Sequence, residues 1–131
     1  MNEKLPYAHN YRELLVYKKA ESLAENIFKE SRSFPEEEVY SLTNQMRRSS
    51  RSVGTQIAEA WGKRMYLKHF VSKLTDAEAE LNETEHWIET ACKCDYLSSR
   101  SGEKLIKECV EIRRLLGGMI LKADSFIIAG K

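Results

Sequence analysis

Residues 66–94, YLKHFVSKLTDAEAELNETEHWIETACKC, carry the longest and clearest apolar pattern of the chain. Apolar or small side chains recur there at steps of three, four and seven residues, at Phe70, Leu74, Ala77, Leu81, Ile88 and Cys92. Residues three and four apart share one face of an α-helix, so this spacing predicts one long amphipathic helix. Such a helix must bury its apolar face against other elements.

The same spacing recurs in three other segments, 12–31, 35–62 and 98–126. Their apolar lines are Leu15 or Val16, Ala20, Leu23, Ile27 and Phe28; then Leu42, Met46, Ser49 or Ser50, Val53, Ile57 and Ala60 or Trp61; then Leu105, Cys109, Ile112, Leu116, Met119, Ala123 and Phe126. Pro35 or Ser41 would start the second helix, and Gly62 would end it. Four helices joined by short turns predict an all-α protein, an antiparallel up-down-up-down four-helix bundle.

The 131 residues suit one domain. Residues 1–10 lack apolar periodicity and are predicted to form an N-terminal tail, residues 11–126 the four-helix bundle, and residues 127–131 a C-terminal tail whose last three residues, 129–131, fray. Gly117 and Gly118 fall inside the fourth predicted helix, where they indicate a bend or a tight helix crossing.

The overall charge excludes a chain that is uniformly coated with cations. Lys and Arg together number 21 against 20 Asp and Glu, for a net charge of +1, so any site for a polyanion must be local. Three cysteines, with no apolar signal segment at the N-terminus, favour reduced thiols and a cytoplasmic location. No stretch approaches a membrane span, so no membrane contact is expected.

Several motifs in a fixed order carry a family resemblance. They are FPEEE at 34–38 followed by LTNQMRRS at 42–49, VGTQIAE at 53–59, and ETEHWI at 83–88. In this order and spacing they resemble the four-helix-bundle proteins encoded in intervening sequences of bacterial 23S rRNA genes. The chain departs from the usual residues of that family at Gln56, Ala60, Thr84 and His86.

The resemblance implies a small helical bundle that assembles into a homo-oligomer, specifically a homopentamer. It also implies a possible nucleic-acid partner, because the accessory protein of diversity-generating retroelements is similar to this family and engages nucleic acid and a reverse transcriptase. For most members of the family no biochemical role is established.

The residues themselves indicate where such a partner would bind. Arg47, Arg48 and Arg51 share one broad face of the second predicted helix with Asn44 and Thr55, opposite its apolar line. Guanidinium groups stay charged and pair with two phosphate oxygens at once, so this face is predicted to bind the backbone of RNA or DNA. Further cations of the predicted site follow at Lys63, Arg64 and Lys68.

In a second interpretation, carboxylates of the protein itself neutralise these arginines. Asp76, Glu80 and Glu83 repeat at helical spacing beside Trp87, and this acidic seam could neutralise the arginines within one bundle or across a subunit interface. The predicted oligomer interface comprises Glu59, Trp61, Glu80, Glu83 and Trp87. The alternative function is then a homo-oligomeric scaffold that recruits a protein partner.

No pattern in the sequence predicts an enzyme, a metal site or a cofactor. Glu80 and Glu83 would lie on a convex helix face, where general acid–base catalysis has no pocket. Cys92-x-Cys94 lacks the spacing of a zinc knuckle, and only one Glu-x-x-His copy occurs, at residues 83–86. Gly54 and Gly62 lack the strand and the Gly-Lys-Ser/Thr sequence of a phosphate loop.

Overall fold

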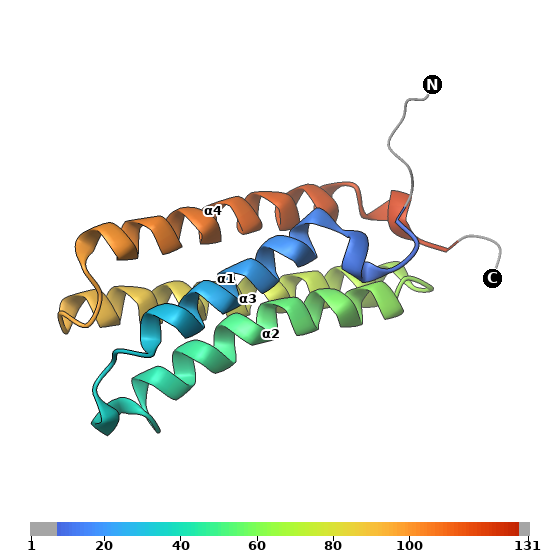
Figure 1. Cartoon of the computed structure of the whole chain (residues 1–131). Coiled ribbons are helices and arrows are strands. Elements are labelled where there is room, and N and C mark those ends of the chain that lie inside the picture. The colour runs from blue at the N-terminus through green and yellow to red at the C-terminus, as the bar shows by residue number, and fades with distance from the viewer. Residues whose placement is uncertain (1–7, 129–131) are drawn as a thin grey trace.

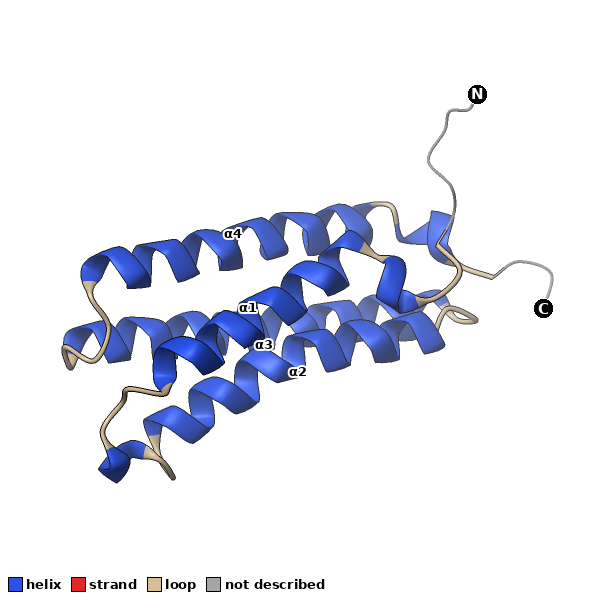
Figure 2. Ribbon diagram, in the orientation of Figure 1, coloured by secondary structure: helices blue, strands red, loops and turns tan. Residues whose placement is uncertain are grey.

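The computed structural model describes residues 8–128. Its four long helices are α1 (Leu15–Ser31), α2 (Leu42–Gly62), α3 (Leu67–Lys93) and α4 (Ser99–Leu121). Consecutive helices run in opposite directions (Figure 1), and short connections join them (Figure 2). Each packs against two neighbours, with the most extensive contact between α2 and α3. The predicted all-α, up-down-up-down bundle is confirmed.

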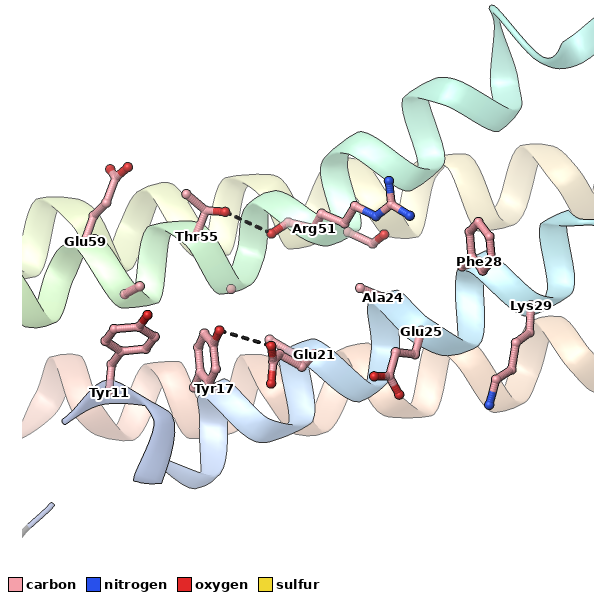
Figure 3. Close-up of a pocket in the computed structure, with 14 residues that line it drawn as sticks. Tyr11, Tyr17, Glu21, Ala24, Glu25, Phe28, Lys29, Arg51, Thr55 and Glu59 are labelled. Carbon is pink, nitrogen blue, oxygen red and sulfur yellow. Dashed lines mark hydrogen bonds between the residues drawn. The ribbon is translucent and has the colours of Figure 1, made fainter. Parts of the chain in front are cut away.

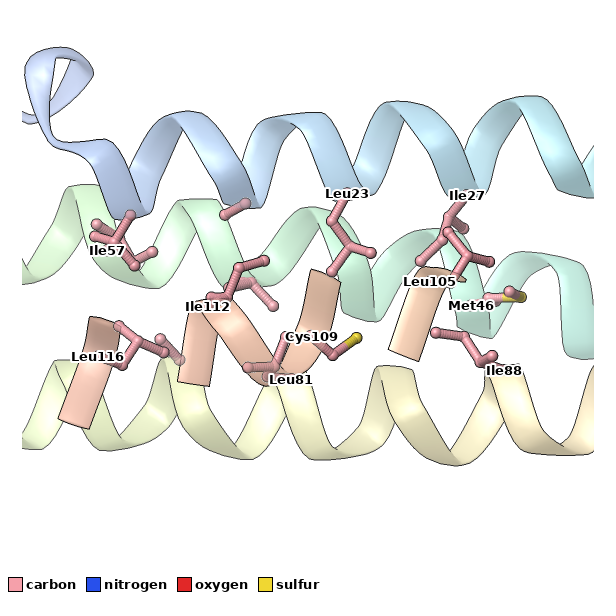
Figure 4. Close-up of a cluster of buried hydrophobic side chains, with 14 of the residues drawn as sticks. Leu23, Ile27, Met46, Ile57, Leu81, Ile88, Leu105, Cys109, Ile112 and Leu116 are labelled. Carbon is pink, nitrogen blue, oxygen red and sulfur yellow. The ribbon is translucent and has the colours of Figure 1, made fainter. Parts of the chain in front are cut away.

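The core lies along the bundle axis, where the four predicted apolar lines meet (Figure 4). Leu23 of α1, Ile57 of α2, Leu81 of α3 and Ile112 of α4 are all buried, as their spacing predicted. Burial of such a side chain stabilises the fold by about 1.5–3 kcal/mol, so the four lines together hold the helices in place.

One pair of hydroxyl groups lies inside this apolar core. Thr84 of α3 donates a hydrogen bond of 2.9 Å to the Oγ atom of Ser49 on α2, and both side chains are fully buried. Thr84 is one of the departures from the family pattern. The Thr84 hydroxyl also lies 2.9 Å from the carbonyl oxygen of Glu80. A buried hydroxyl needs a partner, and Thr84 has one within α3 and a second across the α2–α3 contact.

Phe28 was wrongly predicted to lie in the core. Its ring is 38% exposed at the end of α1, whereas Ile27 beside it is fully buried. Successive helical residues are about 100° apart around the axis, so the one-residue difference turns Phe28 towards solvent and towards α2. The open choice between Leu15 and Val16 is resolved for Val16, which is buried while Leu15 is exposed.

Short 3-10 turns occupy places where the sequence predicted α-helix. Pro35 leads into the turn η2 (Glu36–Glu38), and α2 begins only after Ser41. The first segment begins with η1 (Tyr11–Glu13), capped by the side chain of Asn10, before α1 starts. The predicted end of α2 at Gly62 holds. At the start of α4, the side chain of Ser98 accepts a hydrogen bond from the amide of Ser101 and caps the helix.

The sequence predicted a bend or a tight helix crossing at Gly117 and Gly118, and of these two alternatives the tight crossing is wrong. A Cβ atom at either position would meet open space. The close approach lies instead at Gly102, where a Cβ atom would collide with the sulfur of Cys92 on α3.

The C-terminal segment packs further than the predicted boundary at residue 126. After α4 the chain forms the turn η3 (Ala123–Phe126), and Ile127 then packs against the core. The amide of Ile128 donates to the carbonyl of Arg64 at 3.1 Å. The predicted frayed end, 129–131, and most of the N-terminal tail lie outside the described residues.

Candidate nucleic-acid surface

Three arginines converge on the exposed ring of Phe28, where the end of α1 faces α2. The guanidinium carbon of Arg47 lies 4.5 Å from the centroid of the ring, that of Arg51 5.6 Å and that of Arg32 5.9 Å. Figure 3 shows the Arg51 guanidinium directed along the helices towards Phe28. We call Phe28, Arg32, Arg47 and Arg51 the arginine surface. Attraction between a cation and the face of a ring holds such a cluster together.

The arginine surface has no carboxylate partner among the residues that the structure describes. Among residues 8–128, no Asp or Glu forms an ion pair with Arg32, Arg47 or Arg51. Arg47 is oriented by a neutral group instead, because its Nε atom donates to the Oγ atom of Ser31 at 2.8 Å. Partial burial lowers the pKa of Arg47, and the positive charges of Arg51 and Arg32 lower it further.

A hollow of about 510 Å³ opens along the exposed face of α2 beside these cations. Its lining combines three guanidinium groups with small polar side chains and one apolar wall: Val39, Thr43, Asn44, Arg47, Arg48, Arg51, Ser52 and Thr55. The structure therefore brings together the whole set of residues that the sequence placed on this face. Such a lining can donate several hydrogen bonds to an anion.

Arg48 lines the same hollow, but carboxylates of α3 neutralise its guanidinium. Its guanidinium donates to Glu83 of α3 at 2.7 Å and lies 3.8 Å from Glu80. The hydrogen bond to Glu83 raises the pKa of Arg48. The Nε1 atom of Trp87 also donates to Glu83, at 3.0 Å, and this bond followed by that from Arg48 holds the pKa of Glu83 below its usual value.

The predicted cations Lys63, Arg64 and Lys68 lie apart from the arginine surface. Lys63 lies 16 positions after Arg47 and 12 positions after Arg51, which corresponds to about 24 Å and about 18 Å along the helix. Arg64 packs its guanidinium 3.5 Å from the centroid of the Trp61 ring and donates to the Trp61 carbonyl. The sequence treated these residues as one continuous positive face, whereas they lie beyond the opposite end of α2 and at the start of α3.

The residues of the predicted oligomer interface find partners within the chain. Glu59 accepts a hydrogen bond of 2.7 Å from Lys73, and this bond raises the pKa of Lys73. Glu80, Glu83 and Trp87 form the cluster around Arg48, and Trp61 carries Arg64.

A separate groove of about 660 Å³ runs between α1 and α2 (Figure 3). Small residues form part of its lining: Ala20, Ala24, Ser50, Gly54 and Ala58. Tyr11, Tyr17 and Glu59 lie towards one end, and Phe28 and Arg51 lie towards the other (Figure 3). No pattern in the sequence predicted this groove.

Sequence reasoning also missed Arg32, Phe28 and Ser31 as parts of the site. Phe28 and Arg32 are four residues apart, and side chains at this spacing are neighbours on a helix. The sequence could therefore have predicted this contact. The contact between Ser31 and Arg47 crosses from α1 to α2, and no local pattern in the sequence records it.

Other chemistry finds little support among the described residues. Between residues 8 and 128, no group of three or more His, Cys, Asp or Glu side chains is placed to hold a metal ion. Cys92, Cys94 and Cys109 are free thiols, and burial raises the pKa of Cys109 to about 12. None of the helices in the described part combines the length and hydropathy needed to cross a bilayer.

These features define a class of protein: an antiparallel four-helix bundle with a localised arginine surface that has no carboxylate partner between residues 8 and 128. Over residues 12–118 the chain matches the model of the family described as 23S rRNA-intervening sequence protein. The chain belongs to this family, which confirms the resemblance in its sequence motifs.

A solved structure also resembles the chain. It is the crystal structure of a protein of unknown function from the S23 ribosomal protein family of Bacteroides thetaiotaomicron. The two sequences are 29% identical, and the match covers 81% of this chain and 98% of the other, with a TM-score of 0.71. No curated protein matches the chain.

Proposed function

We propose that this protein is a non-enzymatic, cytoplasmic homo-oligomer that binds the phosphate backbone of RNA or DNA through its arginine surface. One observation carries the proposal: Arg32, Arg47 and Arg51 gather around one exposed ring with no carboxylate partner among residues 8–128. Like charges brought together destabilise a fold, and a polyanion would relieve their repulsion.

A ring of subunits would strengthen such a site. The net charge of one chain is only +1, so a single arginine surface would bind phosphate weakly. A homopentamer, the assembly that the family resemblance suggests, would present five copies to one nucleic-acid strand. The contacts would then add through a high effective concentration.

The direct test compares Arg47→Ala/Arg51→Ala with a control that removes the same charge elsewhere. Arg100→Ala/Lys104→Ala serves, because both side chains are exposed on α4. Fluorescence anisotropy with labelled RNA and DNA, titrated at several salt concentrations, reports affinity and salt slope. Loss of two phosphate contacts should flatten the logarithmic salt slope by about 1.4–1.8.

The control should retain the slope of the wild type, and light scattering should find the same oligomer in all three proteins. Absence of binding at low salt, or an equal loss in the control, would contradict the proposal.

The groove between α1 and α2 favours a second candidate, a homo-oligomeric scaffold that recruits a protein. Small residues such as Ala24 and Ala58 allow close approach of another helix, and the Arg48 cluster with Glu80 and Glu83 is already satisfied internally. Ala24→Arg would fill the groove with a charged side chain. If the groove is an interface, this variant should sediment as a smaller species with unchanged helical content.

A further inference from the structure

A strongly exposed aromatic ring stands beside the proposed nucleic-acid site. Tyr40 is 92% exposed and precedes Ser41, the N-cap of α2. It directly follows Val39, which forms the apolar wall of the hollow on α2. Consecutive Cα atoms are about 3.8 Å apart, so the base of the Tyr40 side chain lies next to that wall. Its hydroxyl makes no hydrogen bond to any residue between 8 and 128.

We infer that the arginine surface binds single-stranded nucleic acid, with one unstacked base placed on the ring of Tyr40. The inference rests on the proposed function and names the form of nucleic acid that the site takes. Every base has a π-face, so an exposed aromatic ring beside bound phosphates provides a stacking platform that does not depend on sequence.

The other aromatic rings at this end of the bundle are already engaged. Guanidinium groups pack against Phe28. Phe34 is buried and packs against Tyr96 with 5.5 Å between ring centroids, and the Tyr96 hydroxyl donates to Glu38 at 2.9 Å. Trp87 of α3 is half-buried, and its Nε1 atom donates to Glu83. Among the described residues, Tyr40 is therefore the most exposed ring beside the α1–α2 connection.

The distribution of charge around α2 favours contact with a single phosphate backbone. The positive side faces α1, where Arg47 and Arg51 lie beside Phe28. On the other side Glu80 and Glu83 of α3 lie around Arg48. A duplex carries two backbones, and its second backbone would face these carboxylates. Its bases are also stacked on one another, so none could reach Tyr40 without being unpaired.

The hollow itself suits a nucleotide better than a helix of nucleic acid. Its volume of about 510 Å³ is in the range of pockets that hold small ligands, roughly 300–1,000 Å³. Asn44 is exposed at its edge and offers both a donor and an acceptor to a base or a sugar. Thr43 also lines it, and its buried Oγ1 atom lacks a partner among the described residues.

The experiment titrates the full-length protein into three labelled RNAs of equal length. One is an unstructured single strand, one is the same strand in a blunt duplex, and one is a single strand with abasic residues at every position. The abasic strand keeps the phosphates and removes the rings, so it separates stacking from charge. Tyr40→Ala is compared with Tyr40→Trp and with Tyr66→Ala, which removes a 61% exposed ring at the start of α3.

The intact single strand should bind about tenfold more tightly than the duplex or the abasic strand, in line with stacking of one base. Tyr40→Ala should lose that advantage with an unchanged salt slope, because the ring carries no charge. Tyr40→Trp should keep it, and Tyr66→Ala should behave as the wild type.

Two results would overturn the inference. If duplex and single strand bind equally, or if Tyr40→Ala binds all three RNAs as the wild type does, the inference is wrong. The proposed function then still stands, provided that Arg47→Ala/Arg51→Ala weakens binding. If none of the three RNAs, nor the corresponding DNA, binds at low salt, the proposed function fails together with the inference.

Discussion

Both flanks of α2 carry arginines, but in the described part of the chain only those on one flank are paired with carboxylates. On the flank beside α1, Arg47 and Arg51 pack against Phe28 without a carboxylate partner among residues 8–128. On the flank beside α3, Arg48 forms a hydrogen bond of 2.7 Å to Glu83. Adjacent residues of a helix point about 100° apart, so Arg47 and Arg48 face different neighbours.

The difference shows that the side chains of the neighbouring helix decide whether an arginine of α2 is neutralised. The paired flank stabilises the α2–α3 contact modestly, because exposed ion pairs contribute about 0–1 kcal/mol. The unpaired flank keeps its charge available to a ligand. Counting arginines along the sequence therefore overestimates the unpaired positive surface, because it does not distinguish paired from unpaired arginines.

The largest expected effect is the loss of the folded bundle, which would disrupt both flanks of α2. Ile57 is buried on the core side of α2, and Ile57→Asp would place an unpaired carboxylate there, at a cost of about 4 kcal/mol or more. Thermal unfolding followed by circular dichroism should show a large fall in Tm or no folded state. Ile57→Val, the matched control, should cost only about 1 kcal/mol. An unchanged Tm in Ile57→Asp would contradict the position of α2.

Neutralising the acidic side should convert the paired flank into a binding flank. In Glu80→Gln/Glu83→Gln, Arg48 loses its counter-charges and becomes free to contact a phosphate. Affinity for RNA should rise, and the salt slope should steepen by about 0.7–0.9, the value for one further contact.

The control for this double variant is Glu89→Gln/Glu103→Gln, which changes the net charge equally at exposed positions on α3 and α4. It should raise affinity less and leave the slope unchanged. An equal gain in both double variants would show that overall charge, and not the release of Arg48, controls binding.

A pH titration should detect the protonation of Glu83, the carboxylate that pairs with Arg48. Hydrogen bonds from Trp87 and Arg48 hold the pKa of Glu83 below its usual value. This pairing therefore stabilises the fold above the unfolded pKa of about 4.3 and is lost as the pH falls through the lower folded pKa. In a Trp61→Phe background, the fluorescence of Trp87 should change in that acid range.

Glu83→Gln in the same background should abolish this fluorescence step, since an amide does not titrate there. Glu38 also has a lowered pKa, held down first by the hydrogen bond from Tyr96. Any loss of stability that its protonation causes should remain in Glu83→Gln. The same fluorescence midpoint with and without Glu83 would assign the step elsewhere.

The smallest effect concerns the orientation of the unpaired flank. Ser31→Ala removes the acceptor that holds the Nε atom of Arg47. Binding of RNA should weaken about two- to threefold, because Arg47 would lose a preferred orientation before binding. Ser33→Ala is the control, since the Ser33 hydroxyl donates only to the carbonyl of Glu30. Equal affinity in wild type and Ser31→Ala would show that this contact does not prepare the site.

The sequence predicted the bundle well because the signals for helices are local. Apolar residues three and four apart must share a face, so the buried lines through Leu23, Ile57, Leu81 and Ile112 could be identified without coordinates. One error arose because two adjacent apolar residues, Ile27 and Phe28, cannot both face the core. Another arose at Gly117, where the sequence could not show that no other helix in the described part of the chain lies close to the glycine.

By itself, then, the sequence determined the four helices, their core faces and the set of arginines from which a site could be built. Only the tertiary structure decided which of those arginines are neutralised. Ser31 lies 16 positions from Arg47, and Glu83 lies 35 positions from Arg48. Charge pairing acts over a few ångströms of space. The packing of α2 between α1 and α3 therefore separates the free cations from the paired one.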